Sequence, residues 1–289
     1  MALGTDDMTI TTGANFIPTV WSKEIIRATE ANLVLADKVW RFDDDVKQYG
    51  QVIKIPNLSN LSALDKAANS QVTLQAPTEG VVTLTVNAQK YVAFLVEDIL
   101  AAQSKYNLMS EYTKKAGYAL QKAIDSSIAN LVTGFSQSTG TYNTTLSTAS
   151  VLAAVQDLDQ ADVPLMDRVW VMHPKTVADL RTISDYTRYD GTGYAGGQAT
   201  GGIGNATVRP NGLVGQLYNS PVFMSTQVPK SGNNTSNMYF QKEALALALQ
   251  KAPRVQTMNR PDYLGDLVVV DTLYGVIETR DGFGVEVKS

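Results

Sequence analysis

A helical repeat of apolar residues constrains the fold of this chain more than any other feature. From Glu97 to Phe135, apolar side chains recur every three or four residues, with lysine, glutamine and aspartate mostly between them. No proline occurs between Pro77 and Pro164, so about thirty residues can form one unbroken helix, roughly 45 Å long at 1.5 Å per residue. We predict a long amphipathic helix whose apolar stripe packs against the core.

Two strand-like segments precede this helix and enclose a polar tip. Residues 49–58 ("YGQVIKIPNL") and 79–98 ("EGVVTLTVNAQKYVAFLVED") are strand-like, and the second alternates apolar with polar side chains. The residues between them, 59–78, are mostly small or polar. A two-stranded hairpin is only marginally stable in water, because too little of its surface is covered. We therefore predict an extended hairpin that needs a partner surface.

The rest of the chain mixes helices with strands. A loose arm and a helical pattern over residues 15–42 come first, and a stretch rich in Gly, Ser and Thr at 133–145 marks a boundary after the long helix. Beyond it we predict a helix capped by Ser147 or Ser150, a buried strand at 167–172 ("DRVWVM") and a second helix. Further strand-like pieces follow, so the predicted fold class is α+β.

A glycine-rich segment invites a nucleotide-binding hypothesis. Residues 191–204 ("GTGYAGGQATGGIG") begin with the spacing G-x-G-x-x-G. A dinucleotide site needs a buried strand before this motif and a helix after it. Here a helical pattern precedes it, and Pro210 with another turn follows it. We interpret the segment as a loop, and a nucleotide-dependent enzyme built around it is the alternative from a different class.

The composition excludes several classes of function. The chain has 289 residues and no cysteine, which rules out disulfides, thiolate nucleophiles and cysteine-ligated zinc. Its net charge of −4 comes without a basic stripe, unlike that of a dedicated nucleic-acid binder. Neither a signal peptide nor an apolar run of the ~18 residues needed to span a membrane is present, so we expect no membrane partner.

Side chains that could carry chemistry are few. His173 is the only histidine and precedes Pro174 at a predicted strand-to-helix turn, so we interpret it as a structural cap rather than a catalytic base. Glu278 and Asp281 are three positions apart, and in a strand their side chains would point to opposite faces. We therefore predict no acid pair there.

Two groups of aspartates raise the question of a metal site. Neither follows the twelve-residue calcium loop with its central glycine and terminal glutamate. We interpret both as solvated charge, and we predict no catalytic, cofactor-binding or metal-binding residues and no enzymatic activity. The first group is Asp43, Asp44 and Asp45, and the second is Asp157, Asp159 and Asp162.

The order of these elements resembles that of the tailed-bacteriophage major capsid proteins, which have the Hong Kong 97-type shell fold. The resemblance starts with "FIPTVWSKEI", the hairpin from "VIKIP" to "VTLTVNAQKYVAFLVED" and the long helix. It continues through "DRVWVMHPKTVADLRTI", "GLVGQLYNSPVFMSTQVP", "YFQKEALALALQKAPRVQ" and "YGVIETRDGFGVEVKS", and so covers nearly the whole chain. An encapsulin-like compartment of bacteria, which encloses an enzyme cargo, uses the same fold and stays open as an alternative.

The resemblance implies a division of the chain into four regions. An N-terminal arm with the first helix spans residues 1–45, and the extended hairpin loop spans 46–96. A peripheral domain, which contains the long spine helix, combines 97–145 with 255–289. A mixed axial domain spans 146–254.

The resemblance also implies a function. We expect a subunit that self-assembles into pentamers and hexamers of an icosahedral shell, which encloses double-stranded DNA through non-specific contacts. Only about fifteen residues precede "NFIPTVW", so we expect a separate scaffolding protein, as well as a portal. The expected location is the virion capsid, assembled in the cytoplasm of a bacterial host, and we expect no cofactor.

Two segments are the candidate subunit interfaces. One is the hairpin tip, which is expected to lie on a neighbouring subunit, and the other is the glycine loop, which is expected near a symmetry axis. A few relatives join a hairpin lysine to an asparagine of a neighbour, promoted by a glutamate. Lys66 has a carboxylate, Asp65, directly beside it, and no particular Asn or Glu of this chain aligns with the family's partners, so we predict no cross-link. The interface residues are Leu61, Leu64, Asp65, Lys66, Val72, Leu74, Gly193, Tyr194, Gly196 and Gly197.

Overall fold

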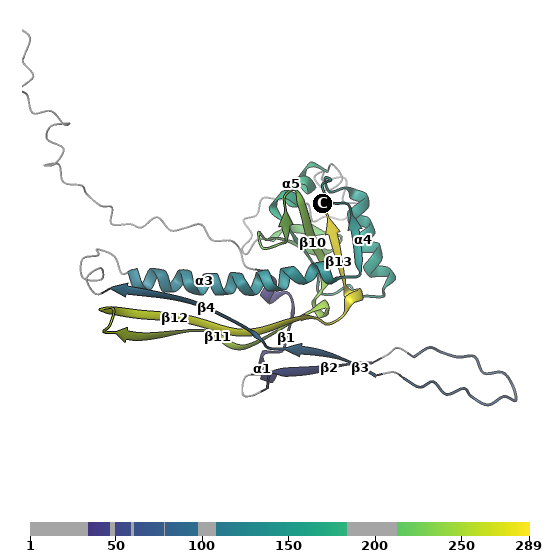
Figure 1. The fold of residues 1–289 in the computed structure, drawn as a ribbon. Helices are drawn as coiled ribbons and strands as arrows, with labels where there is room; N and C mark the ends of the chain where they lie inside the picture. Colours follow the sequence, from purple (N-terminus) through teal and green to yellow (C-terminus); the bar gives the residue numbers. More distant parts are fainter. Residues whose placement is uncertain (1–33, 47–49, 59–60, 78, 98–107, 184–212) are drawn as a thin grey trace, which may run out of the picture. The chain divides into compact units, whose positions relative to one another are not determined.

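A computed structural model describes most of the chain (Figure 1). The described residues all belong to one compact unit, residues 31–289. Their strands form a four-stranded sheet, a seven-stranded sheet and a two-stranded hairpin. The described ranges are 34–46, 50–58, 61–77, 79–97, 108–183 and 213–289.

The four-stranded sheet has the order β1-β11-β12-β4 and lies against the long helix α3. Ala116 and Leu120 of α3 pack on Val268 and Val270 of the sheet. The antiparallel pairs β11–β12 and β12–β4 make up most of it, and β1 joins β11 in parallel. The bounds are β1 (Trp40–Arg41), β4 (Ala88–Glu97), β11 (Leu245–Arg260), β12 (Gly265–Glu278) and α3 (Leu108–Ala129).

The predicted long helix is confirmed over α3, which spans about 33 Å at 1.5 Å per residue. It continues into a short 3₁₀ helix, η3 (Asn130–Gly134). The predicted start is wrong, because Glu97 ends strand β4, and residues 98–107 lie outside the described part of the chain. Both the strand and the helix carry apolar residues, so the spacing of apolar residues alone does not show where the strand ends and the helix begins.

The seven-stranded sheet has the order β5-β13-β10-β6-β8-β7, with β9 paired to β10. Its pairs β6–β8 and β5–β13 are parallel, and the remaining pairs are antiparallel. The ring of Trp170 in β6 stacks on that of Tyr239 in β10 with centroids 3.9 Å apart. The bounds are β5 (Gln137–Gly140), β6 (Arg168–Met172), β7 (Leu213–Leu217), β8 (Ser220–Met224), β9 (Lys230–Ser231), β10 (Asn234–Gln241) and β13 (Gly284–Lys288).

Two helices, α4 (Thr148–Gln160) and α5 (Pro174–Thr182), pack on this sheet, and both of their predicted caps are confirmed. The side chain of Ser147 accepts a hydrogen bond from the backbone N–H of Ser150. His173 Nδ1 accepts one from the N–H of Lys175 at 3.1 Å. Burial, together with nearby lysines, lowers the pKa of His173, which keeps this cap neutral.

The segment 79–98, predicted as one strand, is two. Strand β3 (Glu79–Thr85) pairs with β2 (Val52–Leu58) in the hairpin, whereas β4 pairs with β12 in the four-stranded sheet. Residues 88–96, predicted as part of the hairpin loop, therefore belong to the sheet. The chain changes partners at Val86, whose N–H donates to Gln51. The alternating pattern continues across this change, so periodicity cannot reveal it.

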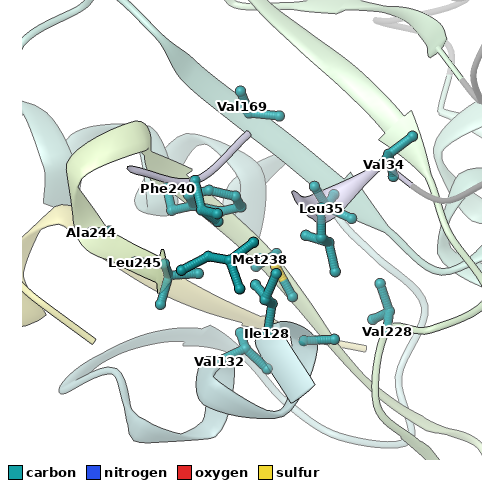
Figure 2. Packing of buried hydrophobic residues seen from close by; sticks show 14 of the residues in the cluster. Val34, Leu35, Ile128, Val132, Val169, Val228, Met238, Phe240, Ala244 and Leu245 are labelled. Atoms are coloured by element: carbon teal, nitrogen blue, oxygen red, sulfur yellow. The ribbon is translucent and has the colours of Figure 1, made fainter. Parts of the chain in front are cut away.

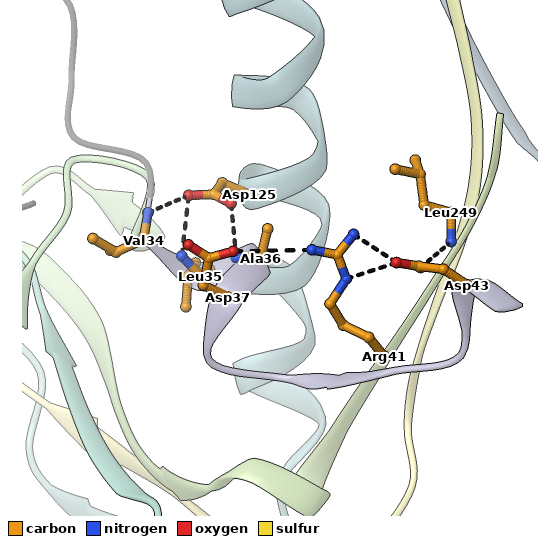
Figure 3. Close-up of polar contacts among 8 residues, drawn as sticks. All are labelled: Val34, Leu35, Ala36, Asp37, Arg41, Asp43, Asp125 and Leu249. Carbon is orange, nitrogen blue, oxygen red and sulfur yellow. Dashed lines mark hydrogen bonds and ion pairs between the residues drawn. The ribbon is translucent and has the colours of Figure 1, made fainter. Parts of the chain in front are cut away.

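The predicted first helix over 15–42 is wrong in its described part. Residues 15–33 lie outside the description, and the rest forms a 3₁₀ helix, η2 (Leu35–Asp37), and then β1. The buried carboxyl group of Asp125 in α3 accepts hydrogen bonds from the backbone N–H groups of Val34, Leu35 and Ala36 (Figure 3). A partner ninety residues away thus overrides the local helical spacing.

Two aspartates that were predicted as solvated charge have specific partners. Asp43, which opens the short helix α1 (Asp43–Val46), pairs with Arg41 at 2.6 Å and accepts from the N–H of Leu249 at 2.8 Å (Figure 3). Asp159 pairs at 2.6 Å with Arg168, whose side chain is buried. The prediction is wrong for these two, because their partners are brought to them by the fold.

One hydrophobic cluster draws on both large sheets (Figure 2). Met238 and Phe240 come from β10 of the seven-stranded sheet, and Leu245 comes from β11 of the four-stranded sheet. Ile128 and Val132, from the end of α3 and from η3, pack against them. The end of the spine helix therefore lies where the two sheets share a core.

Candidate assembly surface

The hairpin continues beyond its paired strands as two facing chains. Strands β2 and β3 pair from Val52 with Thr85 to Leu58 with Glu79. Further out, Gln75 donates to the carbonyl of Ser62 at 2.6 Å and accepts from its N–H at 3.2 Å. These two hydrogen bonds bridge the chains well beyond the last strand residue.

The tip of the hairpin carries apolar side chains that the subunit does not cover. Leu74 is 90% exposed and Leu61 is 66% exposed, although leucine is among the residues most often buried. Leu64 and Val72 are also exposed, and so are Asp65 and Lys66 between them. A cluster of this kind is typical of a surface that contacts another protein. Its place in a subunit interface remains a prediction.

The base of the hairpin, in contrast, is fixed to the four-stranded sheet. Leu84 and Val86 are buried in a cluster with Val46, Ala246 and Ala248. At Gly275 of β12 the approach is so close that an added Cβ would lie 2.4 Å from the carbonyl oxygen of Thr85. Only glycine fits at this position. The base of the hairpin is therefore packed closely on the sheet, whereas the tip is exposed.

The second predicted interface, the glycine loop 191–204, lies outside the described residues, and with it Gly193, Tyr194, Gly196 and Gly197. The nearest described element before it is helix α5, and strand β7 begins at Leu213. Its predicted place near a symmetry axis remains a prediction.

The described residues contain few groups suited to chemistry. Within them, no three His, Asp or Glu side chains come close enough together to hold a metal ion. In that same part of the chain, no helix is long and apolar enough to cross a membrane.

The sequence-based interpretation of Glu278 and Asp281 is wrong. Strand β12 ends at Glu278, and the 3₁₀ helix η5 (Asp281–Phe283) turns the chain back, so Asp281 does not continue the strand. Burial, and then interaction with the Asp281 carboxyl group, raises the pKa of Glu278 to about 7. Their strand-like spacing hides the pair, and only the position of the strand end could have revealed it.

Lys66 provides a test of covalent joining. It is exposed at the hairpin tip, with Asp65 next to it, and a covalent bond to an amide needs an amine that has lost its proton in an apolar pocket. We therefore expect particles boiled in detergent to run as a single band near 31.3 kDa. A ladder of covalent oligomers that disappears in Lys66→Ala particles would contradict this expectation.

Comparison with known proteins identifies the fold. The chain matches a solved structure from Mycobacterium phage Che8 with a TM-score of 0.80 and 26% identity, over 94% of this chain and 97% of that one. It matches the capsid of Cyanophage P-SCSP1u with a TM-score of 0.75 and 16% identity, over 99% of this chain and 96% of that one. It matches the capsid of Ralstonia phage GP4 with a TM-score of 0.70 and 12% identity, over 98% of this chain and 98% of that one.

The architecture is therefore that of a phage capsid shell protein, as predicted. The sequence also matches the phage capsid protein family over residues 80–287, which is more than half of the chain. The chain belongs to this family and is a phage major capsid protein, a structural protein of the virion. A comparison with curated proteins gave no match.

Proposed function

We propose that this subunit self-assembles into the pentamers and hexamers of an icosahedral shell around double-stranded DNA, and that it has no enzymatic activity. The observation that carries the proposal is the hairpin, whose base is buried in its own subunit while its tip exposes leucines. The natural partner for such a tip is a second copy of the chain, because a shell places a copy next to every subunit.

The other partners follow from the same role. We expect non-specific contacts with the packaged DNA, a portal, and a separate scaffolding protein that guides assembly in the cytoplasm of the bacterial host. Uniform shells from the chain expressed alone would contradict the need for scaffolding. Interfaces of obligate assemblies bury roughly 2,000–5,000 Å², so the hairpin supplies only part of the contact between subunits.

Removing the hairpin tip tests the proposal. Leu58 and Glu79 face each other in register, so an Asn-Gly turn can replace residues 59–78 without disturbing the paired strands. We expect a folded subunit, since the buried base is retained, but no closed shells by electron microscopy. Normal shells from this variant would show that the tip is not an assembly element.

A gentler pair of variants separates apolar contact from loop length. The double change Leu61→Ser with Leu74→Ser removes two exposed apolar side chains and should reduce the yield of shells severalfold, because the buried apolar area is lost. The matched control, Gln71→Ala with Thr73→Ala, alters exposed polar residues of the same loop and should assemble normally. Equal yields from the two doubles would argue against an apolar interface.

A further inference from the structure

A hollow of about 410 Å³ lies at the start of strand β6. Its walls come from the end of η2, the loop between α4 and β6, the turn between β7 and β8, and the start of the 3₁₀ helix η4 (Lys242–Ala244). Leu165 and Met166 of the α4–β6 loop line it and are 73% and 79% exposed, although leucine and methionine are usually buried. The hollow therefore carries apolar side chains that its own subunit leaves uncovered.

The loop that carries these two side chains is held firmly in place. The side chain of Arg168, which is 2% exposed, donates to the carbonyl of Pro164 at 3.0 Å and pairs with Asp159 at 2.6 Å. The N–H of Lys242 donates to the carbonyl of Asp167 at 3.2 Å. A surface fixed in this way loses little conformational freedom when a partner binds, so more of the contact energy is retained.

The hollow also offers one free charge of each sign. Asp167 and Lys242 both line it, and within the described part of the chain neither side chain has a hydrogen bond or an ion pair. The other charges are engaged, because Lys38 lies over an aromatic ring and Asp37 pairs with Arg41 at 3.9 Å. A partner that fits the hollow therefore brings apolar side chains together with one acid and one base.

The tip of the hairpin has this combination. Asp65 and Lys66 are exposed there and follow directly on Leu64, which is 55% exposed. Lys66 is complementary to Asp167, and Asp65 is complementary to Lys242. The exposed leucines of the tip are the apolar counterpart of the α4–β6 loop.

A second exposed apolar patch, on the four-stranded sheet, matches the tip less well. Tyr91 and Met258 are 69% and 61% exposed there. Tyr91, Asp271 and Arg254 are in register across β4, β12 and β11. Arg254 and Asp271 already pair with each other at 2.8 Å, so they offer no free charge to the tip. Charge complementarity therefore favours the hollow.

We propose that the hairpin tip of one subunit docks in this hollow of a second copy of the chain. The proposal rests on the proposed function and adds the surface that receives the tip. Tip and hollow are different surfaces of the same chain, so their contact joins copies head to tail. Such a contact closes into a ring where the rotation between copies permits, and pentamers and hexamers are rings of this kind.

Cross-linking within assembled particles tests the docking, because the chain has no cysteine of its own. The variant Leu64→Cys with Met166→Cys places one thiol on the tip and one on the loop that lines the hollow. After treatment with a short bis-maleimide, we expect a denaturing gel to show a ladder of linked chains that ends at five or six copies. Each single cysteine variant should give one band near 31.3 kDa.

The matched control is Leu64→Cys with Tyr91→Cys, which moves the second thiol to the sheet patch and should give no ladder. A ladder from this control but not from the Met166→Cys pair would overturn the proposal. Linked dimers from Leu64→Cys alone would also overturn it, since the tips would then meet each other. Particles in which neither pair cross-links reject the docking but leave shell assembly intact, whereas a wild-type chain that forms no shells rejects the proposed function itself.

Charge reversal decides if the cysteine variants form no particles. Lys66→Asp should lower the yield of shells severalfold, and adding Asp167→Lys in the same chain should restore it, because the pair is re-formed with its signs exchanged. Asp45→Lys, at an exposed acid outside the hollow, should not restore the yield. An unchanged yield in Lys66→Asp, or equal yields with the two second changes, would reject the docking.

Discussion

Replacing Asp125 by alanine is expected to lower the free energy of unfolding by about 3–5 kcal/mol. The carboxyl group is fully buried and accepts from the N–H groups of Val34, Leu35 and Ala36 at 2.9, 3.2 and 3.1 Å (Figure 3). A buried donor left without a partner costs about 1–3 kcal/mol, and partial rehydration keeps the total below the sum of three such losses. Urea unfolding of the unassembled subunit, followed by tryptophan fluorescence, measures the change.

The matched control is Asp65→Ala, which removes the same carboxyl group from an exposed position on the hairpin. A change within about 0.5 kcal/mol is expected there. If Asp125→Ala cost no more than this control, the three N–H groups would have other partners. The attachment of the N-terminal segment to the spine helix would then need another explanation.

The second large effect is expected for Gly275→Ala, which should lower the free energy of unfolding by about 3 kcal/mol. The new Cβ would lie 2.4 Å from the carbonyl oxygen of Thr85 and 3.0 Å from Cα of Val86, so backbone must move. Forcing an extra carbon into a packed region costs about 1–3 kcal/mol, and a backbone obstacle puts this site at the upper end. The same urea titration applies, with hydrogen exchange showing whether β3 separates from β12.

Gly117→Ala is the matched control for this glycine. It makes the same chemical change inside helix α3, where an added Cβ meets nothing within 4 Å apart from the helix itself. Alanine is favoured over glycine in a helix interior, so this variant should be more stable by about 0.5–1 kcal/mol. If Gly275→Ala lowers the stability and Gly117→Ala raises it, the cause at Gly275 is the close approach of the neighbouring backbone rather than the loss of a glycine. A Gly275→Ala chain as stable as the wild type would contradict the predicted cost.

Elements with a strong local signal could be predicted from the sequence. The apolar stripe of α3 and the buried run of β6 were found by their periodicity, and the caps at Ser147 and His173 by local chemistry. The phage capsid fold followed from the order of such segments rather than from any one of them. The extended hairpin was expected because two strand-like segments flank the small and polar residues 59–78.

Features that depend on distant partners could not be predicted in the same way. The conformation of the segment that starts at Val34 depends on the carboxyl group of Asp125, far along the chain. The separation of β3 from β4 depends on their different partners, β2 and β12. The position of Asp281 relative to Glu278 depends on where strand β12 ends, which periodicity locates poorly. The interface role of the tip and of the glycine loop remains a prediction.

Strand β13 has a consequence for the timing of synthesis. It lies between β5 and β10 in the seven-stranded sheet, although it follows both of them in the sequence. A ribosome must therefore release Gly284–Lys288 before β5 can find its neighbour, and translation adds only about 5–20 residues per second. Pairing over such long sequence separations is slow in itself. The pairing of β5 with β13 thus forms later than the pairing of β6 with β10, which needs no residue beyond Gln241.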